Sequence, residues 1–566
     1  MRQEKNYKMF VLLLTTAYIS FVSFSWGVLF LRTLQKINGS NDALSYGFSI
    51  TCFIGLACIG AVAQVISLFT GLGSLPLQAA FLLPAVFSGV FLYKPGNIRA
   101  SAKSFVQTLH PSSVLLLCSS VAMVLVMAVY PVTHPDTIAY HFQVIRWIEK
   151  YPAVPGLANF NYLYGFQNSW FIICGLFSFS FAGTNAITFA NTAVLLWLLV
   201  FLVNKINTAL KKPGQTVQAL PWILLLVFQA WSYTQIRLTA TSASPDFIAV
   251  LYVLLTVYLF FDSSSNASIN DPLVFFLCFF AITLKLSVLP LLLLAAYLAI
   301  PLTRKKNALL LLLCCFVMLP YVMRNIITSG HLFFPAAFPD IIDADWKLST
   351  NKLDAINRYI LAFARTRDNV TEPAKLLAEP FSSWIQHWWA KLYLSDQIII
   401  AVYILSLILL PFRYKTLVRQ RPLNRILIAV SVTGVLFWVL KAPDPRFGLG
   451  FLVLLPALLL VELCSHEKAV RLATPKLVLF ACFLAGCSIA FYTGYRCRNY
   501  FRWTNAVYPA GFTIPYQSFY YREINSSLPL IKESNKNITV SAAADSAYRP
   551  FNFRGKTVTA GFTEKK

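Results

Sequence analysis

Charged residues are scarce in this sequence. Only 12% of the 566 residues are Asp, Glu, Lys or Arg, whereas 57% are hydrophobic and the mean hydropathy is +0.64. A soluble chain of this length would form three or four domains with far more charge on their surfaces. The composition therefore excludes an ordinary soluble protein and indicates a chain that crosses a membrane many times.

The spacing of the eleven cysteines excludes two further classes of protein. Most of them lie inside apolar runs, and no two form a CxxC pair. The sequence therefore indicates neither a zinc site nor a disulfide framework. It also contains no internal repeat and no low-complexity linker.

The net charge of +25 does not indicate a nucleic-acid partner, because Lys and Arg occur in short clusters between apolar runs rather than on one patch. The positive-inside rule places such clusters in the cytoplasm. They fall on alternate turns of the chain, which predicts five cytoplasmic loops at 94–103, 204–214, 303–307, 412–425 and 465–476.

Apolar runs close to the roughly 20 residues needed to cross a bilayer predict an all-α integral membrane protein with about fourteen transmembrane helices. The runs lie at 9–31, 45–70, 77–93, 113–131, 184–203, 219–235, 245–261, 272–286, 287–302, 307–323, 397–411, 425–440, 447–463 and 475–493. We expect three parts: extra N-terminal helices (1–112), a transmembrane module (113–493) and a small extracytoplasmic C-terminal domain (494–566), which includes a strand-like stretch at 537–543.

This alternation places two large loops, 132–183 and 324–396, on the outer face. It holds only if the apolar stretch 162–182 does not span, so we expect an interfacial helix there with Tyr162, Tyr164 and Trp170 at headgroup depth. An ordinary span is the alternative.

The first outer loop contains the sequence HPDTIAYH, which concentrates polar residues directly after a span. Asp136 follows Pro135 and is a good N-cap for a helix whose apolar stripe (Ile138, Phe142, Ile145 and Ile148) would lie on the membrane. A carboxylate at that depth can also take a proton from an attacking hydroxyl. We expect Asp136 to be the catalytic base, with capping alone as the alternative. Tyr140 and His141 are candidate substrate contacts or structural hydrogen-bonding residues.

Two later charges interrupt apolar runs. Asp246 begins a span after Ser-Pro, and an acid there is either an N-cap or functional, because unpaired acids in spans are unfavourable. Lys285 divides a long apolar stretch, which predicts a tight outer-facing turn. Its ammonium would either snorkel to the interface or lie beside an active site.

Two segments place arginine at the outer ends of spans, against the positive-inside bias. The first contains Arg324 and Asn325, and the second is the turn KAPDPRFG with Asp444 and Arg446. The guanidinium group suits phosphate oxygens. An Asp444–Arg446 ion pair that only holds the turn is the structural alternative.

Taken in order, these motifs resemble the GT-C superfamily of membrane glycosyltransferases, which includes the protein mannosyltransferases and the aminoarabinose transferase. The resemblance rests on HPD at 134–136, SPD at 244–246, TLK at 283–285, RN and SG within 324–335, and PDPRFG at 443–448. It implies that Asp136 is the base and that Asp246, Lys285, Arg324 and Arg446 hold a lipid phosphate, in some members with a divalent metal ion. Many members carry two adjacent acids in the first loop, whereas Asp136 stands alone here.

We therefore expect a glycosyltransferase in the cytoplasmic (inner) membrane, with its active site on the extracytoplasmic face. It would transfer a sugar from a polyprenyl-phosphate donor to a glycan, lipid or protein acceptor with inversion. Such an enzyme binds its donor, its acceptor and the lipid bilayer, and no nucleic acid. The alternatives are a lipid-linked glycan flippase or transporter and a glycan polymerase or ligase.

Overall fold

The computed structural model is predominantly α-helical and describes the residues 8–38, 46–88, 109–128, 132, 134–179, 186–212, 216–232, 238–262, 267–300, 304–367, 370–465, 474–497, 530–534, 537–541, 551–554 and 558–564. Tyr130, Pro131, the predicted basic loop 94–103 and most of the predicted C-terminal domain lie outside these residues.

The elements of the first half of the chain are α1 (Lys8–Asn38), α2 (Phe48–Ile66), α3 (Leu75–Phe87), α5 (Pro111–Ala128), η2 (Thr137–His141), α6 (Phe142–Lys150), α7 (Leu157–Phe160), η3 (Tyr162–Gly165), α8 (Ser169–Leu176), η5 (Ala186–Thr188), α9 (Phe189–Lys211), η6 (Thr216–Ala219), α10 (Leu220–Trp231), α11 (Leu238–Ala240), α12 (Asp246–Asp262) and α13 (Ala267–Leu284).

The elements of the second half are η9 (Leu286–Leu291), α14 (Leu292–Ala299), α15 (Arg304–Ser329), α16 (Thr350–Thr366), α17 (Pro373–Leu377), α18 (Phe381–Ala390), α19 (Leu394–Gln420), α20 (Asn424–Lys441), α21 (Pro445–Cys464), α23 (Pro475–Cys497), β1 (Leu530–Ser534), β2 (Asn537–Ser541), β3 (Phe551–Phe553), η11 (Val558–Ala560) and β4 (Phe562–Glu564).

Each of the fourteen apolar runs contains a helix, as the sequence predicts. Within the part of the chain that the structure describes, nine helices are long and apolar enough to cross a membrane. Four more apolar segments are shorter: Leu75–Phe87, Thr216–Trp231, Asp271–Leu284 and Leu286–Ala299. These helices fit a multi-pass membrane protein.

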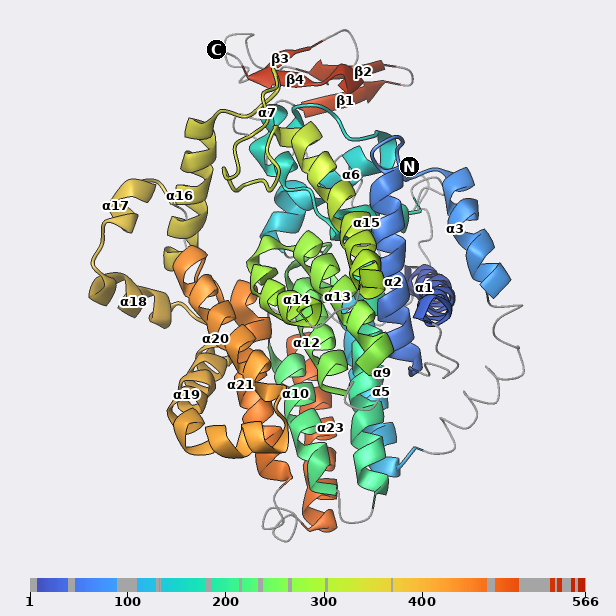
Figure 1. The fold of residues 1–566 in the computed structure, drawn as a ribbon, viewed down its shortest axis with the longest axis vertical. Helices are drawn as coiled ribbons and strands as arrows, with labels where there is room; N and C mark the ends of the chain where they lie inside the picture. The colour runs from blue at the N-terminus through green and yellow to red at the C-terminus, as the bar shows by residue number, and fades with distance from the viewer. Residues whose placement is uncertain are drawn as a thin grey trace.

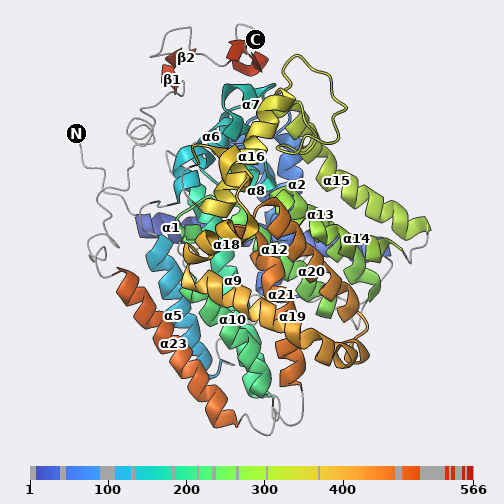
Figure 2. The same ribbon diagram turned by 90° about the vertical axis from the view of Figure 1, so that its left-hand side faces the viewer.

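The first two helices cross at a steep angle. Figure 1 shows α1 nearly end-on beside the vertical α2, and Figure 2 shows α1 lying across the molecule. Glycine allows this close approach. A Cβ atom on Gly55 would lie 1.7 Å from the carbonyl oxygen of Ser23, and one on Gly27 would lie 2.1 Å from that of Thr51. The crossing therefore fixes α1 against the rest of the helical core.

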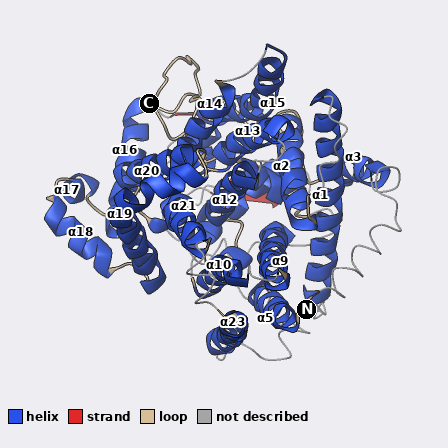
Figure 3. Ribbon diagram, turned by 60° about the horizontal axis from the view of Figure 1, so that its bottom comes forward, coloured by secondary structure: helices blue, strands red, loops and turns tan. Residues whose placement is uncertain are grey.

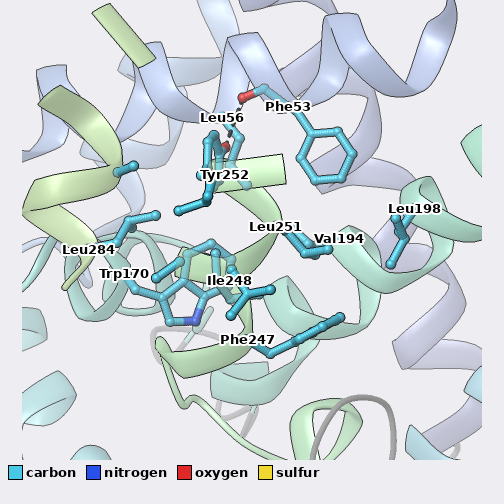
Figure 4. Packing of buried hydrophobic residues seen from close by; sticks show 14 of the residues in the cluster. Phe53, Leu56, Trp170, Val194, Leu198, Phe247, Ile248, Leu251, Tyr252 and Leu284 are labelled. Atoms are coloured by element: carbon cyan, nitrogen blue, oxygen red, sulfur yellow. Dashed lines mark hydrogen bonds between the residues drawn. The ribbon is translucent and has the colours of Figure 1, made fainter. Parts of the chain in front are cut away.

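The core is a continuous apolar cluster in which aromatic side chains fill the spaces between helices. Figure 4 shows Trp170, Ile248, Tyr252 and Leu284 in this packing, and each is at most 1% exposed. The hydroxyl group of Tyr252 donates to the carbonyl oxygen of Phe53 over 2.8 Å, which satisfies its only polar atom.

The strands form two antiparallel pairs, β1 with β2 and β3 with β4. The predicted strand at 537–543 is confirmed over Asn537–Ser541. The strands lie at one end of the molecule, where β4 contacts α7, and the C-terminal end of α9 and the N-terminal end of α23 lie at the other (Figures 1 and 2).

The last strand holds the end of the chain onto the two predicted outer loops. Phe562 is completely buried, with its ring 5.2 Å from that of Phe160 and 6.2 Å from that of Trp147. The Glu564 carboxylate accepts hydrogen bonds from Ser349 and pairs with Lys352 at 2.8 Å.

Two predictions for the first loop are wrong in the same way. Trp170 is completely buried and donates to Asn191 Oδ1 over 2.9 Å, so its side chain faces protein and not lipid headgroups. Ile145 and Ile148 of the expected membrane-facing stripe are also completely buried, and α6 packs against α8. The apolar residues face protein because α8 has folded back into the core.

Candidate active site

Four charged side chains meet where the ends of helices converge, and we call Asp136, Asp246, Lys285 and Arg446 the charged cluster. Asp246 is the first residue of α12, and Lys285 separates α13 from η9. Arg446 is the second residue of α21, after a proline at the first position. Proline is favourable there because its missing N–H would have no partner inside the helix.

Arg446 connects the cluster. Its Nη1 atom lies 3.0 Å from Asp136 Oδ2 and 3.5 Å from Asp246 Oδ2. Lys285 Nζ pairs with the other oxygen of Asp246 and lies 3.5 Å from the centroid of the Phe447 ring. The four formal charges therefore sum to zero within one connected network.

The Asp136 side chain is 36% exposed, which makes it the most accessible member of the cluster. It occupies the N-cap position of η2 but accepts no capping hydrogen bond, so the prediction that it caps this helix is wrong. Burial raises the pKa of its carboxyl, but Arg446, His141 and His134 outweigh this effect and hold the pKa below the usual value. Asp136 is therefore a carboxylate at neutral pH.

His141 lies inside the protein, only 1% exposed. Its Nδ1 atom lies 2.9 Å from Thr137 Oγ1, which in turn lies 2.7 Å from Ser242 Oγ. Burial and the neighbouring His134 lower the pKa of His141 to about 3, so the ring is neutral. These contacts make His141 a structural hydrogen-bonding residue rather than the substrate contact that the sequence suggested.

Tyr140 is half-buried, and its ring centroid lies 4.5 Å from that of His141. Burial and the nearby Asp136 and Asp246 raise the pKa of its hydroxyl, so Tyr140 remains protonated. Its position beside the carboxylates keeps it a candidate substrate contact.

Arg324 and Asn325 do not join the cluster. Arg324 is 3% exposed, and its Nε donates to Gln167 Oε1 over 2.8 Å. Its Nη1 donates to the carbonyl oxygen of Ser67 over 2.8 Å. Asn325 is completely buried and donates to the carbonyl oxygen of Tyr321 over 2.9 Å. In this arrangement neither residue is placed to hold a phosphate, and both connect helices.

Asp444 caps α21 by accepting a hydrogen bond from the Arg446 backbone N–H over 3.1 Å. Its Oδ2 atom also lies 3.4 Å from Arg446 Nε. The predicted Asp444–Arg446 ion pair that holds the turn is therefore confirmed. Arg446 also reaches the two carboxylates of the cluster, Asp136 and Asp246.

Sequence reasoning missed a second set of charges that Asp444 connects to the cluster. Arg367 Nε lies 3.9 Å from Asp444 Oδ2, and Arg367 Nη1 lies 3.7 Å from Asp396 Oδ2. The indole of Trp388 in α18 donates to the carbonyl oxygen of Pro443 over 2.7 Å. The sequence held two signals for this set: Arg367 follows the end of α16, and Asp396 lies in the first turn of α19.

His134 was also missed, although it is the first residue of the HPD sequence. It is 4% exposed, and its Nδ1 atom has no hydrogen-bond partner among the residues that the structure describes. Burial lowers the pKa of His134, so the ring is neutral and able to share a proton beside Asp136. Its position directly before Pro135 and Asp136 was the signal in the sequence.

The cluster does not fit a metal ion. Across the described ranges, no group of three or more His, Cys, Asp or Glu side chains is arranged to hold one. Asp136 and Asp246, the two carboxylates of the cluster, share the Arg446 guanidinium between them. A cationic side chain thus takes the position that a divalent ion would need.

A family model described as a domain of unknown function (DUF8201) matches residues 9–453. The chain belongs to this family. The DUF8201 region contains all four members of the charged cluster and ends before the C-terminal strands. No match to the chain was found among curated proteins or among solved structures. A proposal about function therefore depends on the chemistry of the site.

Proposed function

We propose that this protein is an integral membrane glycosyltransferase that moves a sugar from a polyprenyl phosphate to an extracytoplasmic acceptor. The observation that carries the proposal is the position of Arg446, which is shared by Asp136 and Asp246 while Lys285 lies alongside. A base and two phosphate-binding cations are then within reach of one substrate. The basic loops and the positive-inside rule support a site on the outer face of the cytoplasmic membrane.

In the proposed reaction the acceptor hydroxyl attacks the anomeric carbon while the bond from that carbon to the phosphate oxygen breaks. Asp136 takes the hydroxyl proton, and the polyprenyl phosphate leaves with the electron pair of the broken bond. Attack from the face opposite the leaving group inverts the anomeric carbon. The leaving phosphate gains one negative charge in this step.

The cations act most strongly when that charge develops. Arg446 and Lys285 are held in place before the reaction by the carboxylates, so they need little reorganisation when the phosphate leaves. An arriving donor phosphate competes with Asp136 for Arg446. When Arg446 turns to the phosphate, Asp136 loses its strongest attraction and becomes a better proton acceptor.

The proposal is tested in cells that lack the protein and receive the wild type, Asp136→Asn or Asp343→Asn. Asp343 is exposed on the loop between α15 and α16 and serves as the matched control. We expect Asp136→Asn to lower transfer by about 10²–10⁴-fold, the usual contribution of a general base. Mass spectrometry of surface glycans and lipids measures the product, and immunoblotting confirms equal protein levels.

The same cells distinguish a transferase from a flippase. A transferase defect leaves the lipid-linked sugar on the outer leaflet, where a membrane-impermeant oxidant reaches it, whereas a flippase defect leaves it protected. Wild-type-like transfer by Asp136→Asn, or a protected precursor, would contradict the proposal.

A further inference from the structure

A separate cavity of about 590 Å³ opens among α9, α10, α12 and α21. Figure 3, which brings the opposite end of the molecule forward, shows these four helices next to one another. The walls are apolar and include Leu198, Leu202, Leu251, Leu254 and Leu458. A cavity of this size and character is typical of a site for an apolar small molecule.

The cavity and the charged cluster lie towards opposite ends of the same helices. Asp246 begins α12 in the cluster, and Asp262 ends α12 at the cavity. Arg446 lies in the first turn of α21, and Ser465 follows its last residue at the cavity. The 16 residues from Asp246 to Asp262 correspond to about 24 Å of helix. The lining begins nearer to the cluster, at Leu251 on α12 and Val453 on α21, but none of the four residues of the charged cluster belongs to it. The cavity is therefore distinct from the proposed active site.

Cations surround one end of the cavity. Lys205, Lys212 and Arg421 line it, with Asp262 as their acidic neighbour. Lys205 Nζ donates to the Tyr258 hydroxyl, and that hydroxyl donates to Asp262 over 3.3 Å. Three positive charges against one negative charge attract an anion, and arginine and lysine both bind phosphate oxygens.

The depth of the cavity corresponds to one leaflet. Its lining extends over 11 residues of α12, from Leu251 to Asp262, and over 14 residues from Leu198 in α9 to Lys212 directly after it, which correspond to about 16–21 Å of helix. This length is similar to the thickness of one leaflet, which is half of a hydrocarbon core of about 30 Å. Gln229 is 1% exposed, and its Oε1 atom has no partner in the described structure, so a polar group ends the apolar path at this depth.

We propose that this cavity binds one anionic phospholipid, with an acyl chain among the leucines and the phosphate at Lys205, Lys212 and Arg421. An apolar chain alone would leave the cations without a counter-charge, and a free phosphate would leave the leucine walls empty. A phospholipid satisfies both features. By the positive-inside rule the site faces the cytoplasmic leaflet.

Native mass spectrometry of the full chain in detergent tests the site, with dioleoyl phosphatidylglycerol, dioleoyl phosphatidylcholine and inorganic phosphate as probes. We expect one phosphatidylglycerol to bind about tenfold more tightly than phosphatidylcholine, the effect of one charge-assisted contact. The double substitution Lys205→Gln and Arg421→Gln should remove this preference. Lys415→Gln is the matched control, because Lys415 is exposed on α19 and does not line the cavity.

A second variant tests the apolar part without changing charge. Ala457→Phe places a ring in the cavity and should reduce binding of both lipids at least tenfold, whereas Ala401→Phe on an exposed face of α19 should not. Unchanged unfolding midpoints without lipid confirm that the variants fold. The proposal would be overturned by any of three results: equal binding of the two lipids, wild-type binding by Ala457→Phe, or displacement of phosphatidylglycerol by inorganic phosphate.

Discussion

Arg446 Nη1 lies 3.0 Å from Asp136 Oδ2 although 310 positions separate the two residues in the sequence. This contact connects the first predicted outer loop to the start of α21. It also places a permanent cation against the proposed base. The pKa of Asp136 and its accessibility to a hydroxyl therefore depend on what Arg446 binds.

Arg446→Gln should change the pH dependence of transfer as well as its rate. Arg446 is the strongest of the groups that lower the pKa of Asp136 against the effect of burial, so its removal raises that pKa. The base is then protonated at a higher pH. We expect the acid limb of the pH–kcat/KM profile, which reports the free enzyme, to move upward by about one unit or more, and kcat to fall by about 10²–10³-fold.

The measurement uses membrane fractions assayed from pH 4 to pH 8. Arg358→Gln is the control, since Arg358 is exposed on α16 in the second predicted outer loop. An acid limb that stays in place in Arg446→Gln would show that this guanidinium does not set the pKa of Asp136.

His141→Asn should make the protein less sensitive to acid. The lowered pKa of His141 means that the unfolded chain binds a proton between about pH 6.5 and pH 3 while the folded protein does not. Stability is therefore lost as the pH falls through this range, by up to about 1.4 kcal/mol per pH unit from this residue. The charged and titratable groups that face it are His134, Asp136, Asp246 and Lys285.

Unfolding midpoints in detergent at pH 7 and pH 4.5 measure this effect. We expect a smaller difference between the two midpoints for His141→Asn than for the wild type, with some dependence remaining from His134. His387→Gln, which changes an exposed histidine on α18, should behave as the wild type. An unchanged difference in His141→Asn would mean that its ring is already charged in the folded protein.

Two substitutions of Asp444 separate its charge from its capping role. Asparagine caps a helix about as well as aspartate, so Asp444→Asn keeps the hydrogen bond to the Arg446 N–H but loses the ion pairs with Arg367 and Arg446. Asp444→Ala loses both. We expect Asp444→Ala to be less stable than Asp444→Asn by about 0.5–2 kcal/mol in denaturant unfolding. Both should transfer sugar more slowly than the wild type, and equal stabilities would remove the case for a cap.

Phe562→Ala should release the end of the chain from α7. The ring is completely buried beside Phe160 and Trp147, and truncating such a phenylalanine removes about 3–5 kcal/mol of stabilisation. Limited proteolysis followed by mass spectrometry should show faster cleavage near the C-terminus, whereas Thr563→Ala on the same strand should be cut like the wild type. Equal cleavage of the two variants would show that Phe562 does not hold this end.

Much of the fold follows from the length and position of the apolar runs, because each run contains a helix. What the sequence could not predict is which apolar faces meet protein and which meet lipid. Trp170 belongs to an apolar stretch and Ile148 to the apolar stripe of a helix, and both patterns read the same in either environment. The folding of α8 into the core depends on contacts distant in the chain.

The site was predictable to a similar degree. Asp136, Asp246, Lys285 and Arg446 were each found because a charge at the end of a span is unusual, and the structure brings them together. Arg324 satisfied the same criterion but points to Gln167 and Ser67, since the sequence does not say which way a side chain at a helix end will turn. Arg367 was missed because it follows α16 inside the second predicted outer loop and does not lie at the end of a span.

The distance in sequence between Asp136 and Arg446 also bears on how the protein is made. Asp246 and Lys285 are 39 residues apart and can pair soon after they leave the ribosome. Asp136 must wait for 310 further residues, which at about 5–20 residues per second takes about 15–60 s. During that time Asp136 lacks the arginine that balances its charge. The last step in assembling the charged cluster is therefore the insertion of α21.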